Sequence, residues 1–233
     1  MKNLKNTIFI FDIDSTLVKT ETLDDIIGIA INDGDQCDSQ ESKELIIQKV
    51  KEITDLGMNG EINFQESLNR RFESVQISQK HIDLYNDEIL LQHIDFNFKK
   101  IIEFIYNAGG AVFIVSGGFM DNVSIVAREL GVGMEATFAN EFIKDRGIVI
   151  GFDNNNKLIN NNGKVEVARD IKSKHLYKKV ICVGDGNSDY LIKKSGVADE
   201  FWGFWGNVQR NLLIKKADRN FYSSEALLRF IVG

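Results

Sequence analysis

Three short apolar runs constrain the fold of this chain more than any other feature. They cover residues 7–11, 111–115 and 179–183 and are rich in β-branched and aromatic side chains. Runs that are apolar throughout are typical of strands buried on both faces of a parallel sheet. A stretch with helical spacing precedes the second run, with apolar residues at Phe98, Ile101, Ile102 and Ile105. Strands that alternate with helices predict an α/β fold with a doubly wound, Rossmann-like parallel sheet.

The stretch between the first two runs has a different character. It lacks good strand runs and has long helical patterns, such as the one formed by Ile46, Val50 and Ile53. We therefore predict a small helical cap domain, residues 17–93, inserted after the first strand. Residues 1–16 and 94–233 then form the α/β core. The segment 154–162 (NNNKLINNN) is predicted to be an exposed loop.

Charge and composition exclude several classes of partner. The net charge of −6 argues against a broad nucleic-acid interface, which needs clustered lysine and arginine. No apolar stretch approaches the length of a membrane span, so we predict no membrane partner. The two cysteines, Cys37 and Cys182, are too few and too far apart for a disulfide framework. A reducing compartment, and hence a cytoplasmic location, is the simplest expectation.

Polar residues follow each apolar run or open the helix before the third run. In chain order they are Asp12 and Asp14, Ser116 and Gly117, Lys164, and Asp185 and Asp189. In open parallel sheets, ligands bind beyond the carboxyl ends of the strands. These residues are therefore expected to meet at one edge of the sheet.

The residue types at this edge fit phosphoryl transfer. Crowded carboxylates repel one another unless a cation neutralises them, and ligands that are all oxygen suit Mg²⁺. Ser116 and the N–H groups of the glycines after it can donate to phosphate oxygens, and Lys164 adds positive charge. Two carboxylates two residues apart in extended backbone share a face. One can attack phosphorus while the other handles the leaving-group proton.

These motifs resemble the haloacid dehalogenase superfamily and, within it, the phosphoserine phosphatases. The resemblance rests on residues 11–18 (FDIDSTLV), 116–119 (SGGF) and 184–189 (GDGNSD), with Lys164 at the position of the family lysine. It runs from about residue 7 to the end of the chain and includes the helical cap. The resemblance implies a phosphatase that forms an aspartyl-phosphate and depends on magnesium.

The resemblance also implies a role for each motif residue. Asp12 would be the nucleophile and a metal ligand, with the main-chain carbonyl of Ile13 or Asp14 nearby. Asp14 would act as general acid and then as general base. Ser116, Gly117 and Lys164 would bind the phosphoryl group. The implied metal site consists of Asp12, Asp14, Asp185 and Asp189, the last holding the site from close by.

The resemblance extends to residues that determine substrate specificity in the family. Glu21 stands where the family binds the substrate amine, and Arg71 where it binds the substrate carboxylate. An anion and a cation suit the head of a zwitterionic amino acid. Met58 and Phe64 would screen that pair from water, although plain packing within the cap is an equal expectation for both. Ser188 stands where many family members have asparagine, and it is expected to contribute a minor contact.

Several functions remain open at this level. The first is hydrolysis of O-phospho-L-serine, the last step of serine biosynthesis, by a monomer or homodimer. Alternatives are hydrolysis of another small phosphomonoester, such as phosphothreonine or a sugar phosphate, and phosphotransfer to an acceptor other than water. A catalytically inactive binding protein on the same fold is disfavoured, because all four aspartates are present.

Overall fold

A computed structural model of the chain describes residues 4–33, 39–175 and 179–233. Its main sheet has six strands in the order β3-β2-β1-β6-β7-β8, and every neighbouring pair is parallel. The strands are β1 (Thr7–Phe11), β2 (Ala111–Phe119), β3 (Thr137–Asn140), β6 (Lys179–Gly184), β7 (Glu200–Phe204) and β8 (Arg219–Phe221). All three predicted runs are strands of this sheet, and they lie next to one another at its centre.

Alternating side chains of the central strands divide between two cores. Phe9 and Phe11 point to one face, which α6 (Asn97–Asn107), α7 (Met120–Leu130) and α11 (Ser224–Val232) cover. Ile8 and Ile10 point to the other face, toward α8 (Gly163–Lys174) and α9 (Asn187–Lys194). Helices on both faces of a parallel sheet confirm the predicted doubly wound α/β fold. A short helix, α10 (Asn211–Ile214), follows β7.

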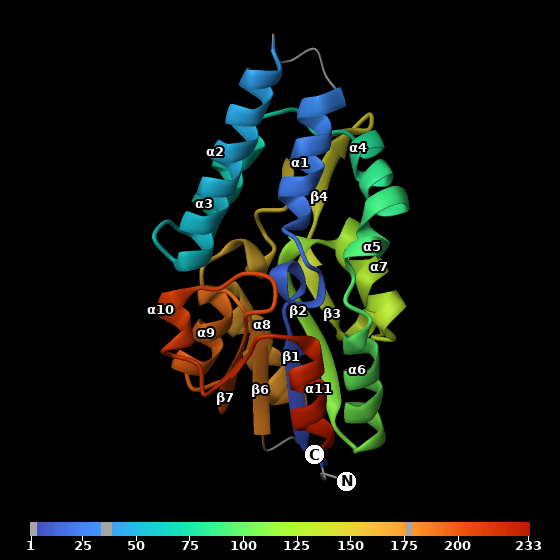
Figure 1. Ribbon diagram of the computed structural model, residues 1–233, viewed down its shortest axis with the longest axis vertical. Helices are drawn as coiled ribbons and strands as arrows, with labels where there is room; N and C mark the ends of the chain where they lie inside the picture. Colours follow the sequence, from blue (N-terminus) through green and yellow to red (C-terminus); the bar gives the residue numbers. More distant parts are fainter. Residues whose placement is uncertain (1–3, 34–38, 176–178) are drawn as a thin grey trace.

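Helices follow β1 in the described part of residues 22–93 and occupy the upper half of Figure 1, beyond one end of the sheet. They are α1 (Thr22–Asp33), α2 (Gln40–Asn59), α3 (Phe64–Phe72), α4 (Gln79–Leu84) and α5 (Leu91–His93), with a wider turn, η2 (Tyr85–Leu90), before α5. An antiparallel hairpin reaches toward the same half, formed by β4 (Phe142–Asp145) and β5 (Ile148–Phe152).

The hairpin departs from the expected organisation. Its backbone bonds to the segment before α4, where the N–H of Gln79 donates to the carbonyl of Gly147 at 2.7 Å and the N–H of Val149 to that of Ile77 at 2.9 Å. A hairpin from the predicted core segment thus hydrogen-bonds to the helical half, the helices and turns of residues 22–93. The pairing depends on contacts between distant residues, and a five-residue strand has no local signal of its partner.

The second strand is longer than predicted. β2 continues through residues 116–119 instead of ending at residue 115, with an irregular register against β3 between Val115 and Phe119. The side-chain amide of Asn140 donates to the carbonyl of Gly117 at 2.8 Å and supports this extension. Ser116 is therefore part of the strand rather than of a turn after it.

Two further sequence expectations concern burial. Cys182 is fully buried in β6, as expected of a small apolar side chain, whereas Cys37 lies outside the described residues. Across the described ranges, no helix is both long enough and apolar enough to cross a membrane.

Candidate active site

The polar residues predicted from the strand ends do meet. Asp12 follows β1, Asp185 and Asp189 follow β6, and one oxygen from each lies within 4.8 Å of the other two. The ammonium of Lys164, in the first turn of α8, is 2.8 Å from a carboxylate oxygen of Asp12 and 2.8 Å from one of Asp189. All four side chains are buried. The ends of neighbouring strands thus concentrate buried charge in a small volume.

The aspartates of this cluster have different surroundings. Asp189 uses both of its carboxylate oxygens within the protein, one on Lys164 and the other on the N–H of Gly186 at 3.1 Å. An oxygen of Asp185 accepts from the hydroxyl of Thr16 at 3.5 Å. Buried carboxylates with only oxygen donors are a set that Mg²⁺ fits. Each of the three aspartates also pairs with a cation of the protein, Asp12 and Asp189 with Lys164 and Asp185 with Arg210 at 3.0 Å.

Asp14 lies beside the cluster but outside its triad. β1 ends at Phe11, and a wide turn, η1 (Ile13–Leu17), follows. Asp14 in this turn keeps extended backbone angles (φ −62°, ψ 139°), whereas Ser15 lies in the left-handed region at φ 53°. One carboxylate oxygen of Asp14 accepts from the N–H of Thr22, the first residue of α1, at 3.0 Å. Asp12 and Asp14 nevertheless line the same cavity.

Burial separates the proton affinities of these groups. Burial and the charge of Asp12 raise the pKa of Asp14 to about 7, although the N–H of Thr22 lowers it. Burial also raises the pKa of Asp185 to about 6, against the lowering effect of Arg210. Burial by itself lowers the pKa of Lys164, but Asp12 and Asp189 raise it above its ordinary value. A carboxyl that holds its proton near neutrality suits a general acid.

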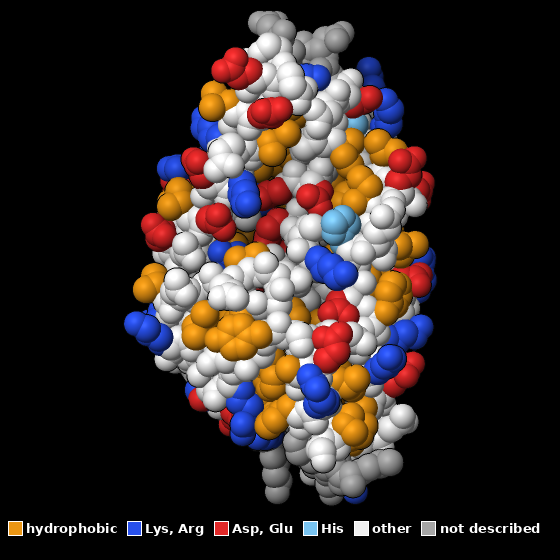
Figure 2. Space-filling view, viewed as in Figure 1, with side chains coloured by type: hydrophobic (Ala, Val, Ile, Leu, Met, Phe, Trp, Pro, Cys, Tyr) orange, Lys and Arg blue, Asp and Glu red, His pale blue; other side chains and the backbone are white. Residues whose placement is uncertain are grey.

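A cavity of about 200 Å³ lies between the strand ends and the helices above them. Figure 2 shows acidic side chains gathered in the hollow near the middle of this face. The predicted residues that line the cavity are Asp12, Asp14, Glu21, Met58, Phe64, Arg71, Gly117, Lys164 and Ser188. Residues from both halves of the molecule therefore face one space.

Glu21 and Arg71 both have polar partners within the protein. A carboxylate oxygen of Glu21 accepts from the hydroxyl of Ser15 at 2.7 Å. Burial, followed by the charge of Asp14, raises the pKa of Glu21 well above its ordinary value. The guanidinium of Arg71 is buried and lies 3.1 Å from an oxygen of Asp24, which also accepts from Thr54 at 2.9 Å. Both charged groups are thus fixed before any ligand arrives.

Phe64 and Met58 bring the helical half against the glycine-rich strand ends. A Cβ atom at Gly117 would lie 2.7 Å from the ring tip of Phe64, and one at Gly186 would lie 3.0 Å from the methyl of Met58. Such approaches are open only to residues without a side chain. The helical half therefore lies closed over the strand ends.

Ser116 differs from its predicted place. Its side chain is fully buried, its hydroxyl accepts from the N–H of Gly118 at 2.9 Å, and it is not among the described residues that line the cavity. The irregular stretch of β2 presents Gly117 and Gly118 to the cavity instead.

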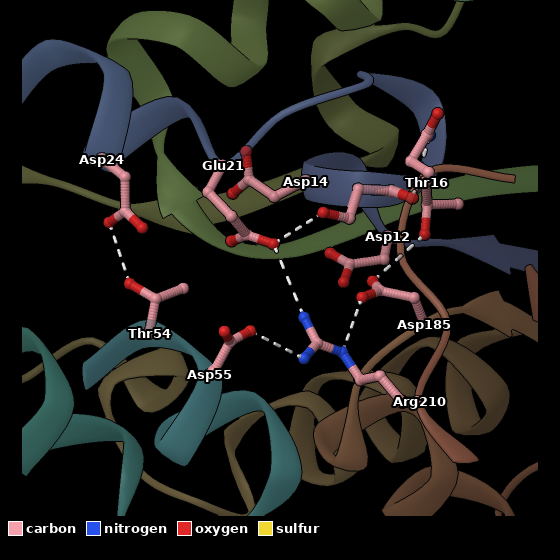
Figure 3. Close-up of polar contacts among 12 residues, drawn as sticks. Asp12, Asp14, Thr16, Glu21, Asp24, Thr54, Asp55, Asp185 and Arg210 are labelled. Carbon is pink, nitrogen blue, oxygen red and sulfur yellow. Dashed lines mark hydrogen bonds and ion pairs between the residues drawn. The ribbon is translucent and has the colours of Figure 1, made fainter. Parts of the chain in front are cut away.

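Arg210 is a site residue that the sequence did not reveal. Its buried guanidinium lies 3.0 Å from Asp185, 3.3 Å from Asp55 on α2 and 3.9 Å from Glu21. Figure 3 shows it pointing between these three carboxylates, which come from three separate segments. An isolated arginine before a short helix has no local pattern that marks it, because its role depends entirely on distant partners.

Comparison with known proteins identifies the family of this chain. A family model described as haloacid dehalogenase-like hydrolase matches residues 9–192. The chain belongs to the haloacid dehalogenase-like hydrolases. The resemblance carried by the sequence motifs is therefore confirmed, and the matched residues include every member of the acidic cluster.

Among these hydrolases, phosphoserine phosphatases are similar over most of the chain. The phosphoserine phosphatase of Homo sapiens is 29% identical over 201 residues, which cover 86% of this chain and 82% of that protein. A phosphoserine phosphohydrolase-like protein from Francisella tularensis is 26% identical, with a TM-score of 0.84 over 99% of this chain and 100% of the other. A phospho-aspartyl intermediate analogue of phosphoserine phosphatase is 25% identical, with a TM-score of 0.76 and coverage of 97% and 99%.

Proposed function

We propose that this protein hydrolyses O-phospho-L-serine to serine and phosphate through an aspartyl-phosphate on Asp12. The observation that carries the proposal is that Glu21 and Arg71 line the same cavity as Asp12 and Lys164. A substrate with a phosphate at one end and a zwitterionic head at the other matches this distribution of charge. The similarity to phosphoserine phosphatases over most of the chain supports the same substrate.

The proposed reaction has two steps that share one acid-base group. An oxygen of Asp12 bonds to phosphorus while the bond to the serine oxygen breaks, and Asp14 gives its proton to that oxygen. Asp14 then takes a proton from water, whose oxygen bonds to phosphorus and releases phosphate from Asp12. The raised pKa of Asp14, about 7, supports both directions of proton transfer near neutral pH. Lys164 stabilises the charge on the phosphoryl oxygens.

We propose Mg²⁺ as the cofactor, held by Asp12, Asp185 and the main-chain carbonyl of Asp14. The buried cluster of oxygen donors fits this ion, and its repulsion calls for a cation. When bound, the ion would neutralise charge on the phosphoryl group. Asp189 would act from outside this ligand set, by keeping Lys164 in place.

We also propose that residues 17–93 form a cap over a core of residues 1–16 and 94–233, with Met58, Phe64 and Ser188 contacting the substrate. The close approach of Phe64 to Gly117 supports a cap that closes during reaction and opens for exchange. A cytoplasmic enzyme of serine biosynthesis, working as a monomer or homodimer, is the cellular setting that we propose from its relatives.

A phosphate-release assay with Mg²⁺ tests the substrate assignment. The panel contains L-phosphoserine, D-phosphoserine, phosphothreonine and a sugar phosphate. We expect a strong preference for L-phosphoserine, and we expect R71A to lose that preference while retaining hydrolysis of the other esters. R70A is the matched control, because Arg70 lies on the same helix but pairs with Glu66 at the surface. Flat or sugar-biased activity of the unmodified protein would contradict the proposal.

A further inference from the structure

The asparagine-rich loop, residues 154–162, is folded against the protein rather than extended into solvent. Its two apolar residues, Leu158 and Ile159, are buried in a short helical turn, η4 (Lys157–Ile159). The side-chain amide of Asn156 donates to the carbonyl of Ala139 at 2.9 Å and accepts from the N–H of Leu158 at 3.0 Å. The loop thus has a defined shape.

Two of these asparagines bond to the first residues of α3. The side-chain oxygen of Asn161 accepts from the N–H of Phe64 at 2.7 Å, and that of Asn154 accepts from the side chain of Gln65 at 3.2 Å. The helix's own cap, Asn63, accepts from the N–H of Glu66 at 2.7 Å. The first N–H groups of a helix have no partner within it. Asn161 therefore satisfies a donor of α3 that the local cap leaves free.

The same loop leads directly into the helix that carries Lys164. Gly163 opens α8, and a Cβ atom there would lie 2.2 Å from the carbonyl oxygen of Lys157. The loop is therefore packed tightly against the start of α8, with Asn161 three residues before Lys164. One short segment links the helix that carries Phe64 and Arg71 to the ammonium beside Asp12.

We propose that Asn161 is a positioning residue that holds α3 against the core while the cap is closed. This role rests on the substrate-binding function proposed above for α3. The bond joins the two halves of the molecule at the rim of the cavity, which Asn161 also lines. The bond determines how closely the ring of Phe64 approaches Gly117. It thereby also determines the position of Arg71 at the other end of α3.

The strength of this contact suits a cap that must reopen. Asn161 is exposed, so water can replace the N–H of Phe64 as its partner when the halves separate. A hydrogen bond that exchanges with water contributes little net free energy, and capping bonds of this kind change an equilibrium by between about threefold and tenfold. Asn161 therefore biases the cap toward closure without locking it.

The test compares N161A with N155A, a matched control in the same loop whose exposed side chain faces solvent. Hydrogen exchange of the α3 N-terminus, followed in a peptide covering residues 60–70, reports the contact without substrate. We expect N161A to speed this exchange by between about threefold and tenfold, and N155A to leave it unchanged. N161D should restore protection, because its carboxylate also accepts an N–H at a helix N-terminus.

Steady-state kinetics then separate positioning from stability. With phosphoserine, N161A should raise KM by a similar factor and leave kcat within about twofold, because binding must first close a cap that is open more often. Unchanged exchange in N161A, or faster exchange with an unchanged KM, would overturn the inference. If the unmodified protein does not hydrolyse phosphoserine, the proposed function fails, whereas the exchange comparison still decides whether Asn161 holds α3.

Discussion

At the scale of single residues, the proposed role of Asp14 as general acid makes its proton decisive for the departure of a poor leaving group. The serine oxygen leaves as an alkoxide unless it is protonated, whereas nitrophenolate needs no proton. General acid catalysis of this kind contributes roughly 10²–10⁴-fold. The position of Asp14, beside Asp12 but capping the N–H of Thr22, keeps its carboxyl near the reaction without crowding the metal site.

We therefore expect D14N to lose phosphoserine turnover by about 10²–10⁴-fold but to release one rapid equivalent of nitrophenol from p-nitrophenyl phosphate. The variant can form the aspartyl-phosphate from the activated ester but cannot activate water to hydrolyse it. Rapid-mixing absorbance and intact-protein mass measure the burst and the added phosphate. D12N is the control that should show no burst. Unchanged phosphoserine turnover in D14N would assign the proton to another group.

Arg210 contributes to stability rather than to the reaction, because its guanidinium neutralises buried carboxylates. Removing one partner of a buried ion pair costs about 3–5 kcal/mol, because the remaining charge is left without compensation. We expect R210Q to lower the free energy of unfolding by that amount in urea. R210K should recover little, because an ammonium cannot bridge Asp185, Asp55 and Glu21. D55N, which removes the half-exposed partner, should cost less than about 1 kcal/mol. An R210Q variant as stable as the parent would contradict this account.

At the scale of elements, two glycines in helices have different surroundings. Gly163 begins α8, and a Cβ atom added there would collide with the backbone of Lys157. Gly28 lies within α1, and a Cβ atom added there would have no neighbour among the described residues within 4 Å, apart from the backbone of the helix itself. Glycine weakens a helix because it loses more backbone conformational entropy on folding than other residues. Replacing it by alanine raises helix propensity, but this stabilises the protein only where the added methyl group has room.

We expect G163A to lower the free energy of unfolding by about 1–3 kcal/mol and G28A to raise it by about 0.5–1 kcal/mol. Denaturant unfolding of both variants at one pH measures the contrast. G163A should also impair phosphoserine hydrolysis, because the displaced start of α8 carries Lys164. Equal stabilities for G163A and G28A would show that the loop before α8 can shift to accommodate the added methyl group.

At the scale of the whole molecule, the buried carboxylates link stability to pH and to metal. Asp14 and Asp185 titrate near 7 and 6 in the folded protein, against an ordinary value of 3.8 for each. Because the folded protein binds these two protons more tightly than the unfolded chain, the protonated carboxyls contribute stability that is fully present below about pH 4. This contribution is lost as pH rises through about 6 and 7. The proposed Mg²⁺ would oppose the loss, because it would bind only the ionised, folded cluster.

We therefore expect the difference in Tm between Mg²⁺ and EDTA to be near zero at pH 5 and to grow to several degrees, on the order of 5 °C, at pH 7.5. Scanning calorimetry across that range measures the difference directly. D185N should flatten the dependence. A constant difference across the range would argue that the ion binds away from this cluster.

The sequence anticipated the elements whose signal is local. β1 and the start of β6 lie where their apolar runs predicted, and Asp12 and Asp185 follow them. Burial on both faces of a sheet demands continuous apolar residues, so these strands are visible in the sequence alone. The end of β2 was misplaced, since Asn140 and an irregular register extend it beyond its apolar run.

Short patterns in consecutive residues were enough to predict the fold class and the polar residues at the strand ends. The distant residues that surround this site became visible only in the folded chain. The hairpin β4–β5, the three carboxylates around Arg210 and the bond from Asn161 to Phe64 all join segments far apart in the chain. Long-range pairs of this kind depend on the path of the backbone, and a polar residue has the same local signal whether its partner is water or a buried charge.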